Sequence, residues 1–213
     1  MKVMDGVWER IYLPSESYEA HQASKLSHKM ELGHTAEKTI SWFRKKFSNP
    51  GLAAFLKSLA GARALCMGAR RGAEVYVLRQ LGLDAIGIDL NPGSTQPDSF
   101  VVKELQGLVV KGDCLRAPWP DGHFSLVYTN SLDHMRPLMT FIDESCRLLS
   151  NNGLLILRIP QQTLAGRWEA LAWTNWEYLL RFFDGKFKRV SAFPTSFPPL
   201  RGGKAMSIVL KRK

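Results

Sequence analysis

Residues 62–92, ARALCMGARRGAEVYVLRQLGLDAIGIDLNP, contain the pattern that decides the fold. The apolar run at residues 64–67 suits a buried parallel strand, and Gly68 follows where the backbone must turn sharply. Residues 73–81 have the apolar spacing of a helix with one face on a sheet. A second apolar run, residues 85–88, is typical of another buried strand. The stretch therefore predicts a βαβ unit, the nucleotide-binding half of a doubly wound sheet.

Two features of this unit indicate which nucleotide to expect. Asp89 ends the second strand, where its carboxylate can accept hydrogen bonds from both hydroxyls of a ribose held over the first turn. Gly72 lacks a β-carbon and so lets the first helical turn approach a ligand closely. The turn reads GARRG, with Arg70 where the dinucleotide pattern G-x-G-x-x-G has its middle glycine. A pyrophosphate fits this turn poorly, which disfavours a nicotinamide-dependent oxidoreductase.

This stretch resembles motif I of the class I S-adenosylmethionine-dependent methyltransferases, in which V-L-D-L-G-C-G-T-G is followed, after one helix, by G-x-D. Residues 111–130, KGDCLRAPWPDGHFSLVYTN, are similar to the family's G-D-a-x-x-L-P-F-P-D-x-S-F-D-x-V, and residues 131–134 resemble the segment after it. The resemblance is to the type 11-like members and extends over residues 52–160. It implies an α/β fold with a Rossmann-like doubly wound seven-strand sheet, mostly parallel with an antiparallel C-terminal strand.

The chain departs from the family at two positions of motif I. Cys66 stands where the family usually has an acid that anchors the cofactor's amino group, and a neutral thiol cannot replace a charge-assisted hydrogen bond of about 1.5–3 kcal/mol. Glu74 is the candidate substitute, although helical spacing places it toward water, where it can equally be an exposed first-turn acid that favours the helix dipole. Arg70 replaces a glycine, and its guanidinium can bind the cofactor carboxylate in a bidentate way.

The resemblance implies S-adenosyl-L-methionine as the cofactor. Asp113 matches the acid that holds the adenine amino group, and Cys114 matches the residue whose backbone amide lies beside it. Glu74 is included because it follows the GARRG turn by two residues and is the candidate substitute for the missing acid. The expected cofactor-binding residues are Gly68, Ala69, Arg70, Gly72, Glu74, Asp89, Leu90, Asp113, Cys114 and Asn130.

Candidate catalytic residues follow the next predicted strand, at residues 124–128, where acceptors usually bind in this family. His134 has a side chain whose pKa suits removal of a proton from a hydroxyl, and Asp133 can orient the imidazole. The alternative is that His134 is a structural residue at a helix start. The other histidines have no metal-ligand spacing, so no metal site is expected.

We expect residues 1–51 to form an N-terminal helical extension and residues 52–213 to form the methyltransferase domain. In this family such extensions often help to close the substrate pocket. Three side chains one helical turn apart are candidates to face the substrate, with a solvated helix face as the alternative reading: Tyr18, His21 and Lys25.

The C-terminal third resembles the closing elements of the fold. A capping-box spacing at residues 174–177 predicts a helix start, and alternation at residues 187–193 and 206–211 predicts an antiparallel hairpin. Two tryptophans in the preceding segment, Trp168 and Trp173, either wall a substrate pocket or pack inside the protein.

The composition limits the partners and the location to be expected for the protein. The 213 residues carry a formal net charge of +10, with the basic excess concentrated after Arg158, and such a field favours anionic partners. No apolar run predicts a membrane span or signal peptide, and the three cysteines lack metal or disulfide spacing, so a cytoplasmic protein is expected.

Two function classes remain open. The first is a methyltransferase whose acceptor is unidentified, with a small molecule or sugar favoured and RNA possible. The second is a degenerate methyltransferase-fold protein that acts as a non-catalytic binding or nucleic-acid-interacting module. Retention of both Asp89 and Asp113 favours the first class, because a scaffold needs neither cofactor acid. The sequence leaves the oligomeric state open.

Overall fold

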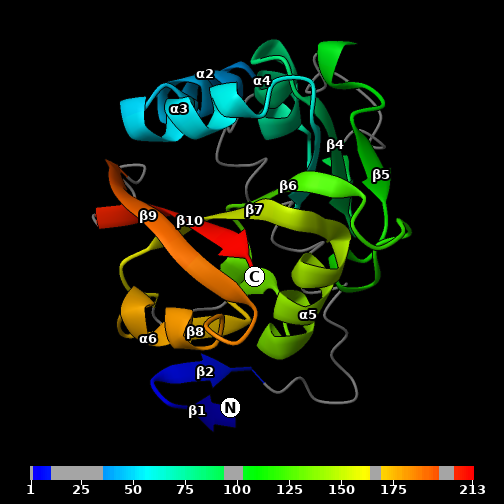
Figure 1. Ribbon diagram of the computed structural model, residues 1–213. Helices are drawn as coiled ribbons and strands as arrows, with labels where there is room; N and C mark the ends of the chain where they lie inside the picture. The colour runs from blue at the N-terminus through cyan, green and yellow to red at the C-terminus, as the bar shows by residue number, and fades with distance from the viewer. Residues whose placement is uncertain (1, 11–35, 94–102, 164–168, 197–203) are drawn as a thin grey trace. The chain divides into compact units, whose positions relative to one another are not determined.

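The computed structural model describes residues 2–10, 36–93, 103–163, 169–196 and 204–213 (Figure 1). The fold is α/β, with a seven-stranded sheet that is mostly parallel, as predicted. By its internal contacts the chain divides into two compact units, one of Tyr12–Pro118 and one of Met1–Ile11 with Trp119–Lys213. This division does not test the boundary expected after residue 51, which stays a prediction.

The unit of residues 12–118 contains the predicted βαβ pattern. Its strands run parallel in the order β5-β4-β3, and its helices α2, α3 and α4 lie side by side in Figure 1. The strands are β3 (Arg63–Met67), β4 (Asp84–Asp89) and β5 (Val109–Lys111); the helices are α2 (Ala36–Phe47), α3 (Pro50–Ser58) and α4 (Ala73–Gln80), with short 3-10 helices η2 (Lys103–Leu105) and η3 (Cys114–Arg116). The strands and the helix expected in residues 62–92 are thus confirmed.

Local signals explain where these helices begin and end. In α2 the apolar side chains Ile40, Phe43 and Phe47 are buried on one face, as helical spacing requires. Asn49 then caps α3, because its side-chain oxygen accepts hydrogen bonds from two backbone N–H groups at the start of that helix. Gly82, with φ of 90°, ends the turn after α4 in a conformation that favours glycine.

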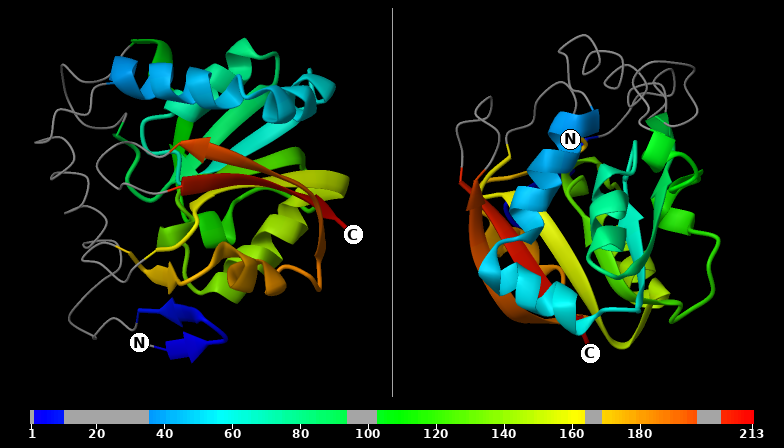
Figure 2. Two further views of the ribbon diagram at one scale, coloured as in Figure 1. Left: turned by 90° about the vertical axis from the view of Figure 1, so that its left-hand side faces the viewer. Right: turned by 90° about the horizontal axis from the view of Figure 1, so that it is seen from above.

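The other unit contains the remaining four strands of the large sheet, in the order β6-β7-β10-β9. Strands β6 (Phe124–Thr129) and β7 (Leu149–Pro160) are parallel, and β10 (Lys204–Arg212) runs antiparallel to both β7 and β9 (Phe187–Ser196). The pairing of β9 with β10, visible in both views of Figure 2, confirms the predicted C-terminal hairpin. The helices of this unit are α5 (Leu138–Leu148), α6 (Trp176–Arg181) and the 3-10 helix η4 (Leu132–His134).

The first residues do not follow the predicted helical extension. Strands β1 (Lys2–Met4) and β2 (Val7–Glu9) form a hairpin, and β2 pairs with β8 (Leu171–Trp173) in a separate three-stranded sheet. Asp5 and Gly6 make its two-residue turn with positive φ values of 33° and 82°, the geometry that Asp-Gly favours in hairpins. The prediction is wrong here because that turn signal was missed and because the partner strand is remote in the sequence.

Glu9 connects this small sheet to α5. Its carboxylate oxygen Oε1 accepts a 2.7 Å hydrogen bond from the backbone N–H of Leu138, the first residue of α5. A negative side chain at a helix N-terminus satisfies a free N–H group and favours the helix dipole.

The structure tests two further expectations, the environment of Trp173 and the start of α6. Trp173 is fully buried on β8 and donates a hydrogen bond to the Pro160 carbonyl, so it packs inside the protein and does not wall a pocket. The N-cap of α6 is Asn175, whose side chain accepts from Glu177, and not Thr174. The remaining candidates of these segments, Tyr18, His21, Lys25 and Trp168, lie outside the described residues.

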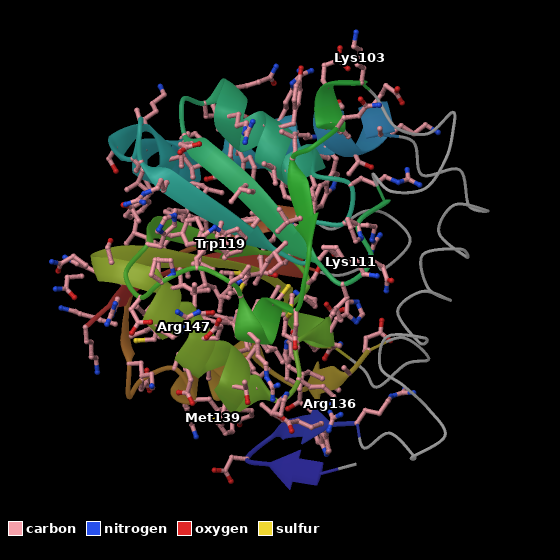
Figure 3. The ribbon with its side chains drawn as sticks, turned by 90° about the vertical axis from the view of Figure 1, so that its right-hand side faces the viewer. Lys103, Lys111, Trp119, Arg136, Met139 and Arg147 are labelled. Atoms are coloured by element: carbon pink, nitrogen blue, oxygen red, sulfur yellow. The ribbon has the colours of Figure 1, made fainter. Side chains whose placement is uncertain are left out.

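Arg147 of α5 holds the loop that leads into β6. Its guanidinium donates to both carboxylate oxygens of Glu144, to the Trp119 carbonyl at 2.7 Å and to Asp121 at 2.9 Å. Figure 3 shows Arg147 and Trp119 within this unit. Because one planar guanidinium satisfies several acceptors, the proline and glycine turn before β6 has a defined position.

Candidate cofactor site

The GARRG turn has the strained backbone of a ligand-binding loop. Three of its five residues have positive φ, namely Gly68 at 73°, Arg70 at 47° and Gly72 at 80°. The backbone N–H groups of Gly68 and Ala69 both donate to the Ile88 carbonyl, at 2.9 and 3.2 Å. The turn after β3 is therefore fastened to the end of β4. A positive φ is uncommon for arginine, and such residues cluster at functional sites.

Asp89 lies at the centre of this arrangement. Its Oδ2 accepts a 2.9 Å hydrogen bond from the backbone N–H of Arg70, and its Oδ1 accepts a 2.8 Å bond from that of Asn91. The side chain is half-buried. Since a carboxylate can accept about four hydrogen bonds, two acceptor positions remain for a ligand. The structure thus brings together the turn and the acid that the sequence predicted to be neighbours.

The residues after β5 join the same cluster. The backbone N–H of Gly112 donates to the Asp89 carbonyl at 3.0 Å. Asp113 is exposed, and its Oδ1 accepts from the Leu115 N–H at 2.9 Å, which caps η3. The buried Cys114 thiol donates a 3.6 Å hydrogen bond to the Ile88 carbonyl oxygen, and burial raises the pKa of this thiol. The predicted adenine-side residues therefore lie beside the predicted ribose acid.

Glu74 is buried, contrary to its expected position toward water. Only 5% of its surface is exposed, although it is the second residue of α4. Burial raises the pKa of its carboxyl to about 8, opposed by the nearby Arg70 and reinforced by Asp89. Cys66 is fully buried on β3, and burial together with the charge of Glu74 raises its thiol pKa. The helical spacing predicted an exposed position for Glu74. The side chain is buried because this first helical turn packs against the ends of the strands.

Gly72 has a packing role in addition to the one expected from the sequence. A β-carbon built at this residue would lie 3.0 Å from Val109 Cγ2 and 3.1 Å from Leu108 Cβ. The absence of a β-carbon at Gly72 therefore leaves room for the side chains of Leu108 and Val109 of the same unit. Glycine also allows the positive φ. Close approach of a ligand to Gly72 stays a prediction.

Asn91 is a polar residue of this cluster that the sequence reasoning missed. Its side-chain nitrogen Nδ2 is buried and has no hydrogen-bond partner among the described residues. A buried amide donor without a partner is costly, so it is a candidate to donate to a ligand. The Asn-Pro pair at residues 91–92, one residue beyond Asp89-Leu90, was the signal in the sequence.

The residues present fit S-adenosyl-L-methionine chemically. Asp89 offers acceptors for ribose hydroxyls, and Glu74 offers a carboxyl group for an ammonium group. Arg70 offers a cation for a carboxylate, and the orphan amide of Asn91 offers a further donor. Nothing in this donor set requires a phosphate ligand.

The candidate catalytic residues lie in the other unit, on η4 after β6. Asp133 Oδ2 and His134 Nε2 are 3.4 Å apart, and both residues are buried. The Asp133 carbonyl accepts from the Ala170 N–H at 2.7 Å, which fixes the 3-10 turn. Asn130 precedes this turn, and its Oδ1 accepts from the Ser131 hydroxyl. The expected acid and imidazole are thus paired, while their catalytic role stays a prediction.

Two searches of the described residues gave negative results. No group of three or more His, Cys, Asp or Glu side chains in these segments could hold a metal ion. None of the helices that the structure describes is long and apolar enough to cross a membrane.

The stability of the protein should depend on pH through Glu74. Burial raises the pKa of Glu74 from its ordinary value of 4.5 to about 8 in the folded state, so the folded state holds one proton more between these pH values. Its contribution to the free energy of unfolding should therefore fall by about 1.4 kcal/mol per pH unit as pH rises through this window. Urea denaturation of the wild type and Glu74→Gln at pH 5, 6.5 and 8 checks this: the variant should gain relative stability at each step, and a constant difference would contradict the prediction.

The mostly parallel sheet has the Rossmann-like arrangement of class I methyltransferase folds. Residues 65–157 match the family model described as "Methyltransferase domain". This match, which covers less than half of the chain, supports a class I S-adenosylmethionine-dependent methyltransferase domain, a family whose cofactor is S-adenosyl-L-methionine.

Two curated methyltransferases are similar to part of the chain. The chain is 32% identical over 92 residues to a probable tocopherol O-methyltransferase of Oryza sativa subsp. japonica, covering 40% of this chain and 25% of that protein. It is 32% identical over 107 residues to norajmaline N-methyltransferase of Rauvolfia serpentina, covering 47% of this chain and 36% of the relative. The chain therefore matches about a quarter to a third of these relatives' length.

A solved structure extends the similarity of fold over nearly the whole chain. The 1,6-didemethyltoxoflavin-N1-methyltransferase of Burkholderia thailandensis, solved with 1,6-didemethyltoxoflavin and S-adenosylhomocysteine, has a TM-score of 0.69 to this structure at 15% identity. The alignment covers 97% of this chain and 95% of the other. At this identity the likeness shows the fold alone.

Proposed function

We propose that the protein transfers a methyl group from S-adenosyl-L-methionine to an acceptor. The observation that carries this proposal is the hydrogen bond from the Arg70 backbone to Asp89, which fastens the GARRG turn to the acid at the next strand end. This arrangement places the helix N-terminus, a ribose-binding acid and the buried Glu74 in one cluster. The cofactor, when bound, supplies a sulfonium methyl that is already electrophilic, so the protein's contribution is binding and alignment.

We assign roles to the predicted cofactor residues on this basis. Asp89 accepts from the ribose hydroxyls, with Leu90 beside it. Asp113 and the Cys114 amide hold the adenine. The turn residues Gly68, Ala69, Arg70 and Gly72 surround the methionine portion together with Glu74.

The acceptor is proposed to be a small organic molecule or a sugar. The similar proteins are named as O-, N- or N1-methyltransferases of individual compounds, which supports a small acceptor with a nucleophilic oxygen or nitrogen. For a hydroxyl acceptor, His134 takes the proton while Asp133 stabilises the resulting imidazolium.

Ligand-dependent thermal stability tests the cofactor assignment. S-adenosylmethionine and S-adenosylhomocysteine at 100 times Kd should each add about 2.7 kcal/mol of stability and raise Tm, whereas NAD should leave it unchanged. A shift with NAD alone would point to an oxidoreductase. No shift with any of the three would favour a scaffold without cofactor.

A nucleic-acid-binding module is the second candidate function, and one surface favours it. On α6 and β9 the guanidinium of Arg181 lies 5.0 Å from the Tyr178 ring centroid, and that of Arg189 lies 5.6 Å from the Trp176 ring centroid. Exposed aromatic and cationic side chains are the groups that bind single-stranded nucleic acid. If this is the function, RNA should bind with strong salt dependence in a protein that S-adenosylhomocysteine does not stabilise.

A cytoplasmic location is proposed with the methyltransferase function. Cys66, Cys114 and Cys146 are all free thiols, which suits a reducing compartment.

A further inference from the structure

We propose that Glu74 is the group that binds the cofactor's ammonium ion, and that cofactor binding therefore expels a proton from this side chain into solvent. The inference rests on the proposed function and deepens it, because it names the anchor of the methionine end and makes cofactor affinity depend on pH.

The first step is the position of the carboxyl group. The family's usual acid would be on β3, where this chain has Cys66. Glu74 is on the first turn of α4, directly after the GARRG turn, and only 5% of its surface is exposed. Its charge also raises the pKa of the buried Cys66 thiol. The carboxyl group is thus provided by the helix in place of the strand, while its neighbourhood is retained.

The second step concerns the charges around Glu74. Arg70 in the turn and Asp89 at the end of β4 act on it with opposite signs, and burial outweighs both. An uncharged carboxyl group is therefore the stable form in the absence of ligand at pH 7. An acid kept neutral by burial is poised to ionise when a cation arrives beside it.

Charged groups on the other elements that pack against α4 do not alter this conclusion. On α2, Arg44 donates to Gln80 at the far end of α4, and the Lys46 ammonium lies 5.5 Å from the Trp42 ring centroid. On η2, Lys103 and Glu104 are exposed. The shift of the Glu74 pKa has contributions from Arg70 and Asp89 and not from these groups.

The third step is the proton balance. The free protein holds Glu74 as the acid, and the ligand carries a protonated α-amino group. On binding, the O–H bond of the Glu74 carboxyl group breaks, its proton passes to water or buffer, and the resulting carboxylate pairs with the ammonium group. Affinity should then rise about tenfold per pH unit between pH 6 and 7. The release should fall to zero near pH 8, where the carboxyl and the α-amino group themselves titrate.

Isothermal titration calorimetry with S-adenosylhomocysteine measures this release directly. Titrations at pH 6.5 in phosphate and in Tris, which have different ionisation enthalpies, give the number of protons from the dependence of the observed heat on the buffer. The wild type should release about one proton, and Glu74→Gln should release none and bind with little dependence on pH. Repetition with the wild type alone at pH 8 needs no variant and should give no net release.

Glu177→Gln is the matched control, because Glu177 is also the second residue of its helix, α6, and is exposed. It should release protons as the wild type does. Equal release by wild type and Glu74→Gln, or binding by the wild type without release at pH 6.5, would overturn the inference and leave the proposed function standing. Failure of the wild type to bind S-adenosylhomocysteine at all would overturn the proposed function and the inference with it.

Discussion

Replacing Asp89 by alanine should weaken the binding of S-adenosylhomocysteine by at least about 100-fold, which is about 2.8 kcal/mol. The change removes charge-assisted hydrogen bonds to the ribose, each of about 1.5–3 kcal/mol. It also removes the acceptor for the Arg70 backbone N–H, so the GARRG turn loses its 2.9 Å link to β4. Asp89→Asn keeps one acceptor oxygen and should bind with intermediate affinity. The dissociation constants are measured by calorimetry at constant pH.

The control for this prediction is Asp84→Ala at the exposed beginning of the same strand. It removes the same charge from β4 but lies away from the turn, so it should bind as the wild type does. An equal loss of affinity in Asp84→Ala and Asp89→Ala would show that binding depends on the net charge of β4 and not on a specific contact with the ribose. Binding by Asp89→Ala at wild-type strength would contradict the proposed site.

Replacing Gly87 by alanine should lower the free energy of unfolding by about 1–3 kcal/mol, because it overpacks the interior. Its added β-carbon would lie 2.6 Å from the Ala69 β-carbon and 3.0 Å from methyl groups of Val75 and Val109. Relief of the first contact requires movement of the GARRG turn, so cofactor affinity should fall together with stability. Urea denaturation gives the stability, and calorimetry gives the affinity.

Gly185→Ala is the matched comparison, since no atom lies within 4 Å of a β-carbon built there. It should change stability by less than about 1 kcal/mol. If Gly87→Ala unfolds at the same urea concentration as the wild type, the close packing of β4 against the turn is not as described.

Much of the cofactor half of the site follows from local pattern. The apolar runs at residues 64–67 and 85–88, and the helical spacing between them, are encoded within a few residues of one another. Asp89 could be placed for the same reason, because a parallel βαβ unit brings its two strand ends to one edge. The candidate pair Asp133 and His134 is adjacent in sequence, so its proximity was also predictable.

What required the tertiary structure was the environment of individual side chains. Glu74 has the spacing of an exposed helical residue, yet it is buried, because burial depends on what packs against the helix and not on helical period alone. Gly72 accommodates Leu108 and Val109, which follow it by more than thirty residues in the chain.

The sequence by itself determined the βαβ unit, the acid at the end of β4 and the family resemblance, since each depends on short-range order. Only the tertiary structure decided that residues 2–9 form a hairpin that pairs with β8, that Trp173 packs inside, and that the Glu74 carboxyl is buried. Each of these depends on segments brought together from distant parts of the chain, and no local propensity encodes such a contact.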